Sequence, residues 1–523
     1  MRFLLSHSEM KSCDSSTTER YGIPPEVLME RAALAVRDTV LQEFAPEKVL
    51  VLCGSGNNGG DGFAAARLLL LSGVQADVLF LGTHAHMTDQ CLLEEKIFQN
   101  YGGRLLEDDA DIHGYDLIID ALFGIGLSRD VLGRYADMIN AVNRADTPVL
   151  SVDIPSGISA DDGQIMGTAV RADVTVTFQY EKLGQMLFPG AEYCGKLVVA
   201  DVGISDCLSV RDSDEPVCTL ERSDLASLLP RRHADDNKGD CGKLLIAAGN
   251  SGMAGAAILA ARAAFRSGVG MVCILTHEDN RLAVQTAVPE AIFAPWPGST
   301  ETGNSEAGKS GCAGVPGYSA VDRWLSWCDA AAVGPGFGRT DQSRKLLTYI
   351  LRNYAGPLVV DADALNIMSE NPQLAPINSV PAIITPHPGE MKRLLNAHRA
   401  KEEPEISTEE IVSHPVGIAR DFAKTSGMIT VLKGARTVVT DGDEVMLNTL
   451  GNEGMATAGS GDSLTGIIGS PLAQRLDPFE AARTGVLLHA LAGDRAAAKL
   501  GTRSMKAGDL ADCLPDVLKD HRY

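Results

Sequence analysis

The hydrophobic and polar positions in the first half of the chain predict a repeated succession of strand, turn and helix. Residues 24–44 carry apolar side chains at helical spacing, and the apolar run Lys48–Cys53 has the length of a buried strand. A glycine-rich turn, Gly54–Gly62, follows this strand and precedes a helical stretch that begins at Phe63. Because strands that alternate with helices pair in parallel, the pattern predicts an α/β sheet.

Polar side chains follow the next strand-like runs, which cover 116–120, 149–153 and 174–178. Ligands of open α/β sheets bind beyond the carboxyl ends of the strands, so we expect these polar groups to face one crevice. The expected set is Asn57, Asn58, Asp61, Asp120, Asp153, Ser156 and Lys182. Oxygen donors without Cys or His suit a hard cation such as K⁺ or Mg²⁺. The alternative is that Asp120 and Asp153 only cap turns.

The second half repeats this plan. Strand-like runs, each followed by a glycine or a polar residue, begin at residues 244, 271, 330, 358, 382 and 429. They predict a second, mostly parallel sheet with one functional edge.

The stretch Gly451–Gly466 places an acid inside a glycine-rich turn that leads into an apolar, helix-like run from about residue 462 to 468. Gly459 and Gly461 let backbone N–H groups approach a ligand, and the N-terminus of a helix attracts an anion. A carboxylate beside a phosphate is unfavourable unless it takes a proton. We therefore interpret Asp462 as a general base for a hydroxyl that attacks a phosphoryl group. The alternative is a helix-capping Asp.

Two further polar residues follow predicted strands of the second half. His387 lies between Pro386 and Pro388, which fix its backbone direction, although a lone histidine is more often structural. Lys433 with Gly434 resembles a phosphate-facing hairpin turn, and a solvated lysine is the alternative.

Length and charge limit the classes of protein. A chain of 523 residues exceeds one core, so two or three domains are expected, and 45% hydrophobic residues predict a chain folded throughout. The net charge of −22 argues against nucleic acid or an anionic membrane as a partner. The polar, acidic stretch 205–216 is interpreted as the linker between domains 1–215 and 216–523.

The apolar run in the opening residues is too short for a signal peptide, and no later stretch is long and apolar enough to span a bilayer, so a soluble, cytoplasmic protein is expected. Eleven scattered cysteines without a C-x-x-C pair fit reduced thiols in a cytosolic enzyme.

Two motifs match nucleotide-binding patterns without their context. Gly54, Gly56 and Gly59 satisfy G-x-G-x-x-G, but no acid follows the second strand, so a small-molecule site is favoured over a redox-cofactor site. Residues 303–310 match the P-loop but lie in a Gly/Ser-rich insertion, 297–319, without flanking strand and helix. We interpret that match as chance and expect a mobile surface loop.

The ordered motifs resemble a known family over nearly the whole chain. Residues 57–61, 120–124, 153–157 and the Lys182 segment resemble NAD(P)H-hydrate epimerase domains. Residues 237–239, 334–336, 361–366, 385–390, 432–435 and 459–462 resemble ribokinase-like, ADP-dependent NAD(P)H-hydrate dehydratases. Together they resemble the bifunctional NAD(P)H-hydrate repair enzymes. The resemblance implies two three-layer αβα domains, a Rossmann-like one and a ribokinase-like one.

For the N-terminal domain, the resemblance implies interconversion of R- and S-hydrates of NADH and NADPH. Asn58, Asp120 and Ser156 would hold K⁺, and Asp153 and Lys182 would move protons. The implied substrate-binding residues are Asn57, Asn58, Gly59, Gly60, Asp61, Gly124, Ile125, Gly126, Leu127, Ser128, Arg129, Asp130 and Asp153.

For the C-terminal domain, the resemblance implies dehydration of the S-hydrate with ADP and Mg²⁺, releasing AMP and phosphate, with Asp462 as the base. Ala256, Gly338, His387 and Asp462 would contact the hydrate. Lys433, Gly434, Ala435, Arg436, Thr437 and Gly461 would contact the nucleotide. A homo-oligomer is expected. The sequence does not decide between ADP and ATP as the nucleotide that the C-terminal domain uses.

Two alternative functions stay open. A ribokinase-type small-alcohol kinase would use the same Asp462 and anion site but release a phosphorylated product. The N-terminal half would then be a non-catalytic binding module, although the presence of Asp61, Asp120 and Asp153 argues against this.

Overall fold

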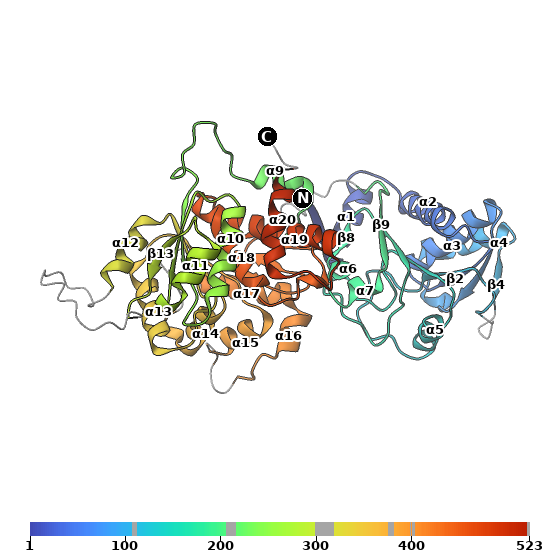
Figure 1. The fold of residues 1–523 in the computed structure, drawn as a ribbon. Helices are drawn as coiled ribbons and strands as arrows, with labels where there is room; N and C mark the ends of the chain where they lie inside the picture. The colour runs from blue at the N-terminus through green and yellow to red at the C-terminus, as the bar shows by residue number, and fades with distance from the viewer. Residues whose placement is uncertain are drawn as a thin grey trace, which may run out of the picture. The chain divides into compact units, whose positions relative to one another are not determined.

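The computed structural model describes residues 1–106, 112–204, 216–298, 318–374, 381–397, 399 and 403–519. The chain divides into two compact units: a first unit, Phe3–Val217, and a second unit, Cys218–Tyr523 with Met1 and Arg2 (Figure 1). The predicted linker at 205–216 and the predicted insertion at 297–319 lie almost wholly outside the described residues.

The first unit is built on a parallel sheet of seven strands in the order β4-β3-β2-β5-β6-β7-β9. In that order the strands are β4 (Arg104–Leu106), β3 (Gln75–Phe80), β2 (Lys48–Cys53), β5 (Leu117–Ala121), β6 (Val149–Val152), β7 (Val174–Phe178) and β9 (Lys196–Ala200). Outside these seven strands, β1 (Arg2–Leu5) pairs in parallel with β8 (Glu181–Lys182). The predicted strand beginning at residue 48 has the predicted bounds.

Both faces of this sheet are covered, because alternate residues of β2 enter different cores. Val49, Val51 and Cys53 pack with α2 and α3 residues, whereas Leu50 and Leu52 pack with Ile139 and Val142 of α5. The helices are α1 (His7–Glu19), α2 (Pro25–Glu43), α3 (Asn57–Leu71), α4 (Asp89–Asn100), α5 (Arg134–Val142), α6 (Leu183–Met186) and α7 (Gly190–Tyr193). The unit is therefore the predicted three-layer α/β structure.

The helix after β2 starts earlier than predicted. It begins at Asn57 instead of Phe63, so only Gly54–Gly56 form the turn and the following glycines lie inside α3. A Cβ at Gly59 would lie 2.0 Å from the Gly54 carbonyl oxygen, and a Cβ at Gly62 would lie 2.8 Å from Cys53 Sγ. The sequence analysis placed these glycines in a turn. In the structure they lie in a helix, where the absence of a side chain permits close packing of α3 against β2 and its neighbours.

The second unit contains a sheet that is parallel from β13 to β17 and ends in two antiparallel pairs, β17–β18 and β18–β19. In spatial order the strands are β13 (Ile292–Pro295), β12 (Met271–Thr276), β11 (Lys243–Ala247), β14 (Ala330–Val333), β15 (Leu358–Val360), β16 (Ala382–Ile384), β17 (Ile429–Leu432), β18 (Val438–Thr440) and β19 (Val445–Leu447), followed by β10 (Val217–Thr219). The predicted hairpin after β17 is confirmed, and the antiparallel end of the sheet was not predicted.

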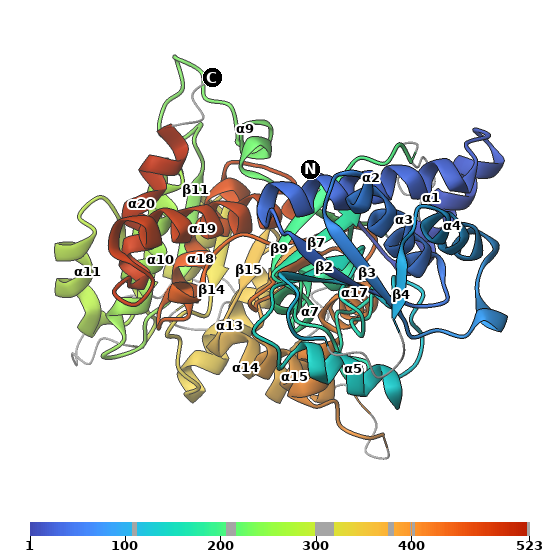
Figure 2. The same ribbon diagram turned by 90° about the vertical axis from the view of Figure 1, so that its right-hand side faces the viewer.

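Helices pack against both sides of this sheet (Figure 2). They are α9 (Leu225–Leu228), α10 (Ala254–Arg266), α11 (Arg281–Ala287), α12 (Ser319–Trp327), α13 (Asp341–Asn353), α14 (Asp363–Glu370), α15 (Pro388–Ala397), α16 (Thr408–Ser413), α17 (Pro415–Ser426), α18 (Ser460–Ala473), α19 (Pro478–Leu500) and α20 (Ala507–Lys519). The close contact of α10 with α18 needs Gly466, since a Cβ there would lie 1.9 Å from the Ala260 carbonyl oxygen. The predicted α/β class with two mostly parallel sheets is confirmed.

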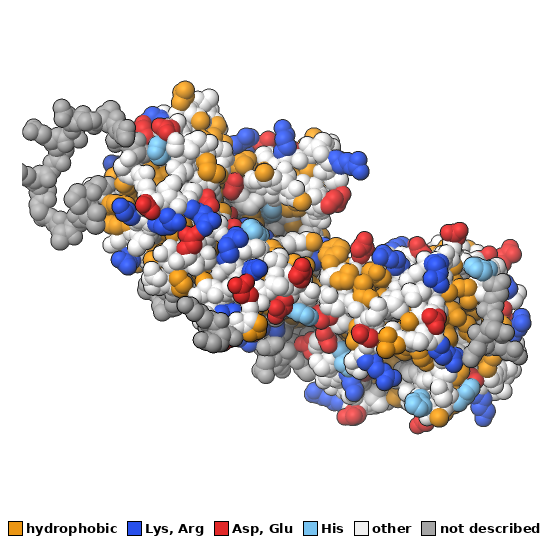
Figure 3. All heavy atoms as spheres, turned by 90° about the horizontal axis from the view of Figure 1, so that it is seen from below, with side chains coloured by type: hydrophobic (Ala, Val, Ile, Leu, Met, Phe, Trp, Pro, Cys, Tyr) orange, Lys and Arg blue, Asp and Glu red, His pale blue; other side chains and the backbone are white. Residues whose placement is uncertain are grey.

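On the face drawn in Figure 3, Lys and Arg side chains lie scattered among Asp and Glu side chains and do not gather in one area. Within the described part of the chain, no helix is both long and apolar enough to cross a membrane.

Candidate active sites

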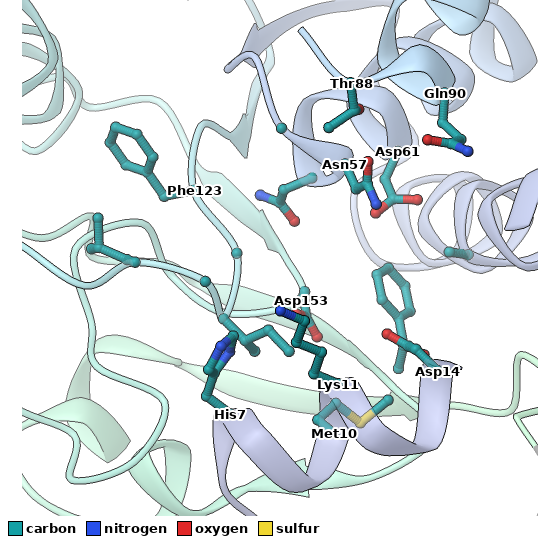
Figure 4. A pocket seen from close by; sticks show the side chains of 18 of the residues that line it. His7, Met10, Lys11, Asp14, Asn57, Asp61, Thr88, Gln90, Phe123 and Asp153 are labelled. Carbon is teal, nitrogen blue, oxygen red and sulfur yellow. The ribbon is translucent and has the colours of Figure 1, made fainter. Parts of the chain in front are cut away.

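In the first unit, the predicted polar residues meet at the carboxyl edge of the sheet. Strands β2, β5 and β6 are parallel neighbours, so the α3 N-terminus, Asp120 and Asp153 lie at one edge. A cavity of about 1250 Å³ opens there, and Asn57, Asn58, Asp61, Gly124–Asp130, Asp153 and Lys182 are among its lining residues. Figure 4 shows Asn57, Asp61 and Asp153 around this cavity. Gly59 and Gly60 are buried within α3 and are not among the residues that line the cavity.

Asp153 and Lys182 form a buried ion pair at the cavity wall. Lys182 Nζ lies 2.6 Å from Asp153 Oδ1 and 2.7 Å from Thr177 Oγ1, and the lysine is 0% exposed. The Asp153 carbonyl accepts a hydrogen bond of 2.7 Å from Gln185 Nε2. Asp153 has φ +66°, a strained conformation for most residues, so these contacts hold its carboxylate in place against the backbone preference.

Asp120 is the centre of a second, fully buried polar cluster. Ser156 donates to it from Oγ at 2.6 Å and from the backbone N–H at 2.8 Å, and Ser151 Oγ donates at 2.8 Å. Complete burial raises the pKa of Asp120, against the hydrogen bonds from Ser156 and Ser151, which lower it. Within the described part of the chain, no Lys or Arg forms an ion pair with this carboxylate.

Asn58 lies next to this cluster. A Cβ on Gly124 would lie 3.2 Å from Asn58 Oδ1, and the neighbouring Phe123 N–H donates to Ser156 Oγ at 2.8 Å. Asn58 is 9% exposed, and its Nδ2 makes no hydrogen bond in the structure. The structure thus brings Asn58, Asp120 and Ser156 together as an oxygen-rich group.

In the second unit, Asp462 lies in the first turn of α18, as the glycine pattern predicted. Gly459, the residue before the helix, has φ +89°, and a Cβ on it would lie 3.8 Å from Asp462 Oδ2. Burial raises the pKa of Asp462 to about 6, helped by the charges of Asp361 and Asp363 and opposed by Lys433. At neutral pH this carboxyl is therefore mostly ionised but is more basic than an exposed aspartate.

Lys433 is held by acids and is not a solvated lysine. Its Nζ lies 2.7 Å from Asp361 Oδ1 and 4.0 Å from Glu390 Oε2. Asp361 is 1% exposed and accepts a second hydrogen bond of 2.7 Å from Thr465 Oγ1 of α18. Burial alone would lower the pKa of Lys433, but Asp361 and Glu390 outweigh it and the pKa is raised. Asp361 thus connects the end of β15, the β17–β18 hairpin and the Asp462 helix.

The other predicted residues of the second unit surround this cluster. Gly461 is adjacent to Lys433, since its Cβ would lie 3.4 Å from Lys433 Nζ. His387 is half exposed, with Nε2 3.4 Å from Glu390 Oε1, and burial lowers its pKa. The Gly338 N–H donates to Asp363 Oδ2 at 2.7 Å. The remaining predicted positions are Ala256 in α10, which is adjacent to Gly336, and Gly434, Ala435, Arg436 and Thr437 in the hairpin loop.

Sequence reasoning missed several charged residues of both sites. Asp361 and Glu390 lie within the motifs 361–366 and 385–390, which were noted only for their resemblance to the dehydratase family. An acid at a strand end, close to a loop that carries a lysine, is the sequence feature that could have identified them. Asp14 and Lys11, which line the cavity of the first unit, lie on α1, and no local pattern marked that helix.

Together, the two sites define a class: a two-unit α/β protein with an oxygen-lined cavity in one unit and a lysine–carboxylate cluster at a helix N-terminus in the other. Comparison with known proteins narrows this class. Residues 244–516 match the NAD(P)H-hydrate dehydratase family, and residues 25–184 match the YjeF-related protein N-terminus. The chain is 37% identical to the bifunctional NAD(P)H-hydrate repair enzyme of Moorella thermoacetica over 99% of this chain and 97% of that protein.

The enzyme of the same name from Escherichia coli is 34% identical over 90% of this chain and 84% of that protein. A solved structure of the ADP/ATP-dependent NAD(P)H-hydrate dehydratase from Bacillus subtilis, co-crystallised with ATP/Mg²⁺, is 28% identical, with a TM-score of 0.48 over 58% of this chain and 99% of that chain. The chain belongs to the family of bifunctional NAD(P)H-hydrate repair enzymes, so the predicted resemblance is confirmed.

Proposed function

We propose that the first unit interconverts the R- and S-hydrates of NADH and NADPH, and that the second unit dehydrates the S-hydrate with ADP. The observation that carries this proposal is the placement of Asp462, ionised at neutral pH, at a helix N-terminus beside the acid-held Lys433. Family membership over nearly the whole chain supports the pairing of the two activities.

In the second unit, Asp462 would take the proton of the ring hydroxyl. The hydroxyl oxygen would then bond to the terminal phosphorus of ADP, and AMP would leave. The C–O bond of the resulting phosphate ester would break, phosphate would leave, and the neighbouring ring carbon would lose a proton to restore the reduced nicotinamide. Backbone N–H groups of 459–462 and Lys433 would stabilise the transferring negative charge. Residues 433–437 and Gly461 would bind the nucleotide, and Ala256, Gly338 and His387 the hydrate.

Mg²⁺ would accompany the nucleotide. Lys433 already faces the carboxylates of Asp361 and Glu390, so a diphosphate entering this cluster adds negative charge that the lysine alone does not balance. Both carboxylates supply the hard oxygen ligands that Mg²⁺ prefers, and they would hold the ion together with phosphate oxygens. The ion would supply charge neutralisation.

In the first unit, the Asp153–Lys182 pair would exchange protons with the hydrated ring, since both residues line the cavity and are held rigidly to each other. Asn57, Asn58, Asp61 and Gly124–Asp130 would form the substrate site, with Gly59 and Gly60 behind them in α3. K⁺ would be held by Asn58, Asp120 and Ser156. The donor set fits, because the Asp120 carboxylate is fully buried and the other two proposed ligands, Asn58 Oδ1 and Ser156 Oγ, are neutral oxygens.

Removal of K⁺ is expected to impair only the first unit. Dialysis into a buffer containing N-methylglucamine as the cation should lower the epimerisation rate at least tenfold and leave dehydration of S-hydrate unchanged at saturating Mg²⁺. This is checked by measuring both rates while K⁺ is titrated back. Asp120→Asn is the control, because its residual epimerisation rate should not depend on K⁺. Equal K⁺ dependence of both reactions would contradict the assignment.

The pH dependence of dehydration follows from Asp462. A general base works in its deprotonated form, and burial raises the pKa of this group to about 6. We therefore expect kcat/KM for the S-hydrate to be on a plateau above pH 7 and to fall by about tenfold per pH unit below pH 6. Initial rates between pH 5 and 8 measure this limb, and a rate that rises toward low pH would contradict the role of Asp462 as base.

One experiment separates the proposed function from the small-alcohol kinase. Purified full-length protein is incubated with hydrated NADH, ADP and Mg²⁺, and the absorbance of the reduced ring is followed together with AMP and phosphate. Recovery of absorbance with one phosphate per ring supports repair. Consumption of nucleotide with a phosphorylated organic product, and no recovery, would support the kinase.

A further inference from the structure

Helix α1 brings a carboxylate to the first-unit cavity that no motif identified. The helix starts at a capping box in which Ser6 N–H donates to Glu9 Oε2 at 2.8 Å and Ser6 Oγ accepts from the Glu9 N–H at 3.3 Å. Strand β1 precedes it and pairs Leu5 with Lys182, so α1 begins beside the buried lysine. Its core face holds Met10, Cys13 and Thr17, and the next position, Asp14, is half buried and lines the cavity.

The charged groups around Asp14 come from three other elements and from its own helix. Figure 4 shows Asp61 of α3, Asp153, and His7 and Lys11 of α1 near Asp14. Lys182 of β8 also lines the cavity. Burial raises the pKa of Asp14 to about 6, with a further rise from Asp153 and a decrease from Lys182. Burial also raises the pKa of Asp61, helped by Asp153 and Asp14. Asp14 and Asp61 are therefore weaker acids than exposed aspartates.

Asp14 and Asp153 differ in what restrains them. Asp153 is held by Lys182, which is itself fixed by Thr177 and by the Phe178 carbonyl at 3.3 Å. Asp14 forms no ion pair within the described part of the chain, and its helix supplies part of the cavity wall. The cavity thus offers a carboxylate that is paired with a lysine, Asp153, and an unpaired carboxyl, Asp14, whose pKa burial raises to about 6.

Inversion of a hydrated nicotinamide needs two proton-transfer groups. A dihydropyridine ring takes up water at a carbon bonded to its nitrogen, so the hydrate is a hemiaminal, and inverting that carbon requires one of its polar bonds to break and reform. Loss of the oxygen is the step for which the second unit consumes a nucleotide. Breaking the C–N bond instead leaves the oxygen on carbon, so this route needs only proton transfers and no nucleotide.

We propose that Asp14 is the base that takes the hydroxyl proton while Lys182, held by Asp153, donates a proton to the ring nitrogen. The O–H electrons form a carbonyl, and the C–N electron pair moves onto the nitrogen, which is conjugated with the carboxamide through the remaining ring double bond. Rotation of the aldehyde and the reverse proton transfers close the ring with the hydroxyl on the other face. No atom is gained or lost and no group is oxidised. The inference rests on the proposed epimerisation in the first unit.

The test compares Asp14→Asn with Glu26→Gln in the full-length protein. Both remove one carboxylate from a helix of the first unit, but Glu26 is exposed in the first turn of α2 and is not among the residues that line the cavity. Enzymatic epimerisation, followed by separating the R- and S-hydrates and subtracting the spontaneous rate, should fall at least about 100-fold in Asp14→Asn and less than twofold in Glu26→Gln. Dehydration of S-hydrate by the same samples checks that the protein is folded.

A pH profile separates proton transfer from a structural role. In the wild type and in Asp14→Glu, the epimerisation rate should decrease as the pH is lowered below about 6. In Asp14→Asn the residual rate should lack this acid limb, that is, this decrease at low pH. A slowed variant that keeps the limb, or an Asp14→Asn protein within twofold of wild type, overturns the proposal. A wild-type protein that does not accelerate epimerisation overturns the proposed function itself.

Solvent labelled with ¹⁸O tests the bond that breaks. In early time points, product hydrate should keep its original oxygen, because C–N cleavage leaves the oxygen on carbon. Incorporation of one solvent oxygen per inversion means C–O cleavage and overturns the ring-opening step.

Discussion

Replacement of Asp462 by Asn is expected to lower ADP-dependent dehydration by about 10³-fold, because the amide accepts no proton and general-base catalysis is worth between about 10² and 10⁴. Epimerisation should remain at the wild-type rate, since the Asp462 helix belongs to the other unit. Loss of a charge from the first turn of α18 costs about 0.3–1 kcal/mol of helix-dipole stabilisation, which is too little to unfold the unit. Single-turnover dehydration of S-hydrate measures the effect.

Asp341→Asn is the matched control for this substitution. Asp341 also lies in the first turn of a helix, α13, but its side chain is 90% exposed and pairs with Arg344 at 3.3 Å. This variant should dehydrate the hydrate within twofold of wild type. If Asp462→Asn kept more than a tenth of wild-type activity while binding ADP normally, Asp462 would not be the base.

Replacement of Asp153 by Asn is expected to abolish epimerisation, by about 10³-fold or more, while dehydration of pure S-hydrate continues. Asn is the informative substitute because it tolerates the positive φ of this position better than most residues. The change also leaves Lys182, which is 0% exposed, without its counter-ion. Breaking a buried pair in this way costs about 3–5 kcal/mol, so the first unit should melt at a lower temperature.

The double variant Asp153→Asn/Lys182→Met separates the two effects of this substitution. Removing both charges leaves no buried unpaired ion, so calorimetry should show the stability of the first unit largely restored. Epimerisation should stay as low as in Asp153→Asn, because the proton-transfer groups are missing. Recovery of epimerisation in the double variant would mean that the single change acted only through stability.

The two sites hold their functional carboxylates by different structural means. Asp153 follows β6, and its unusual backbone conformation is sustained by one hydrogen bond from Gln185 and by the Lys182 pair. Asp462 stands at the start of α18, where the helix end attracts the anion that the base must work beside. The surrounding fold therefore stabilises an unfavourable feature of each acid: the positive φ of Asp153 and the burial of the Asp462 carboxyl.

The sequence by itself determined the class of the fold and the edge on which each site lies. Buried parallel strands are short apolar runs followed by glycine or polar residues, so periodicity located β2, β5 and β11 and the carboxyl ends where Asp120 and Asp153 stand. The helix N-terminus at Gly459–Asp462 could also be predicted, because a glycine-rich turn followed by an apolar run is a pattern of consecutive residues.

Only the tertiary structure decided which charges meet. Lys433 and Asp361 are 72 residues apart and Thr465 lies 104 residues from Asp361, yet their side chains join at 2.7 Å. Asp14 belongs to a helix that no local sequence pattern marked, and its relation to Lys182 depends on the pairing of β1 with β8. Long-range pairing sets burial and neighbouring charge, and these two quantities decide whether a carboxyl is a surface acid or a base near neutral pH.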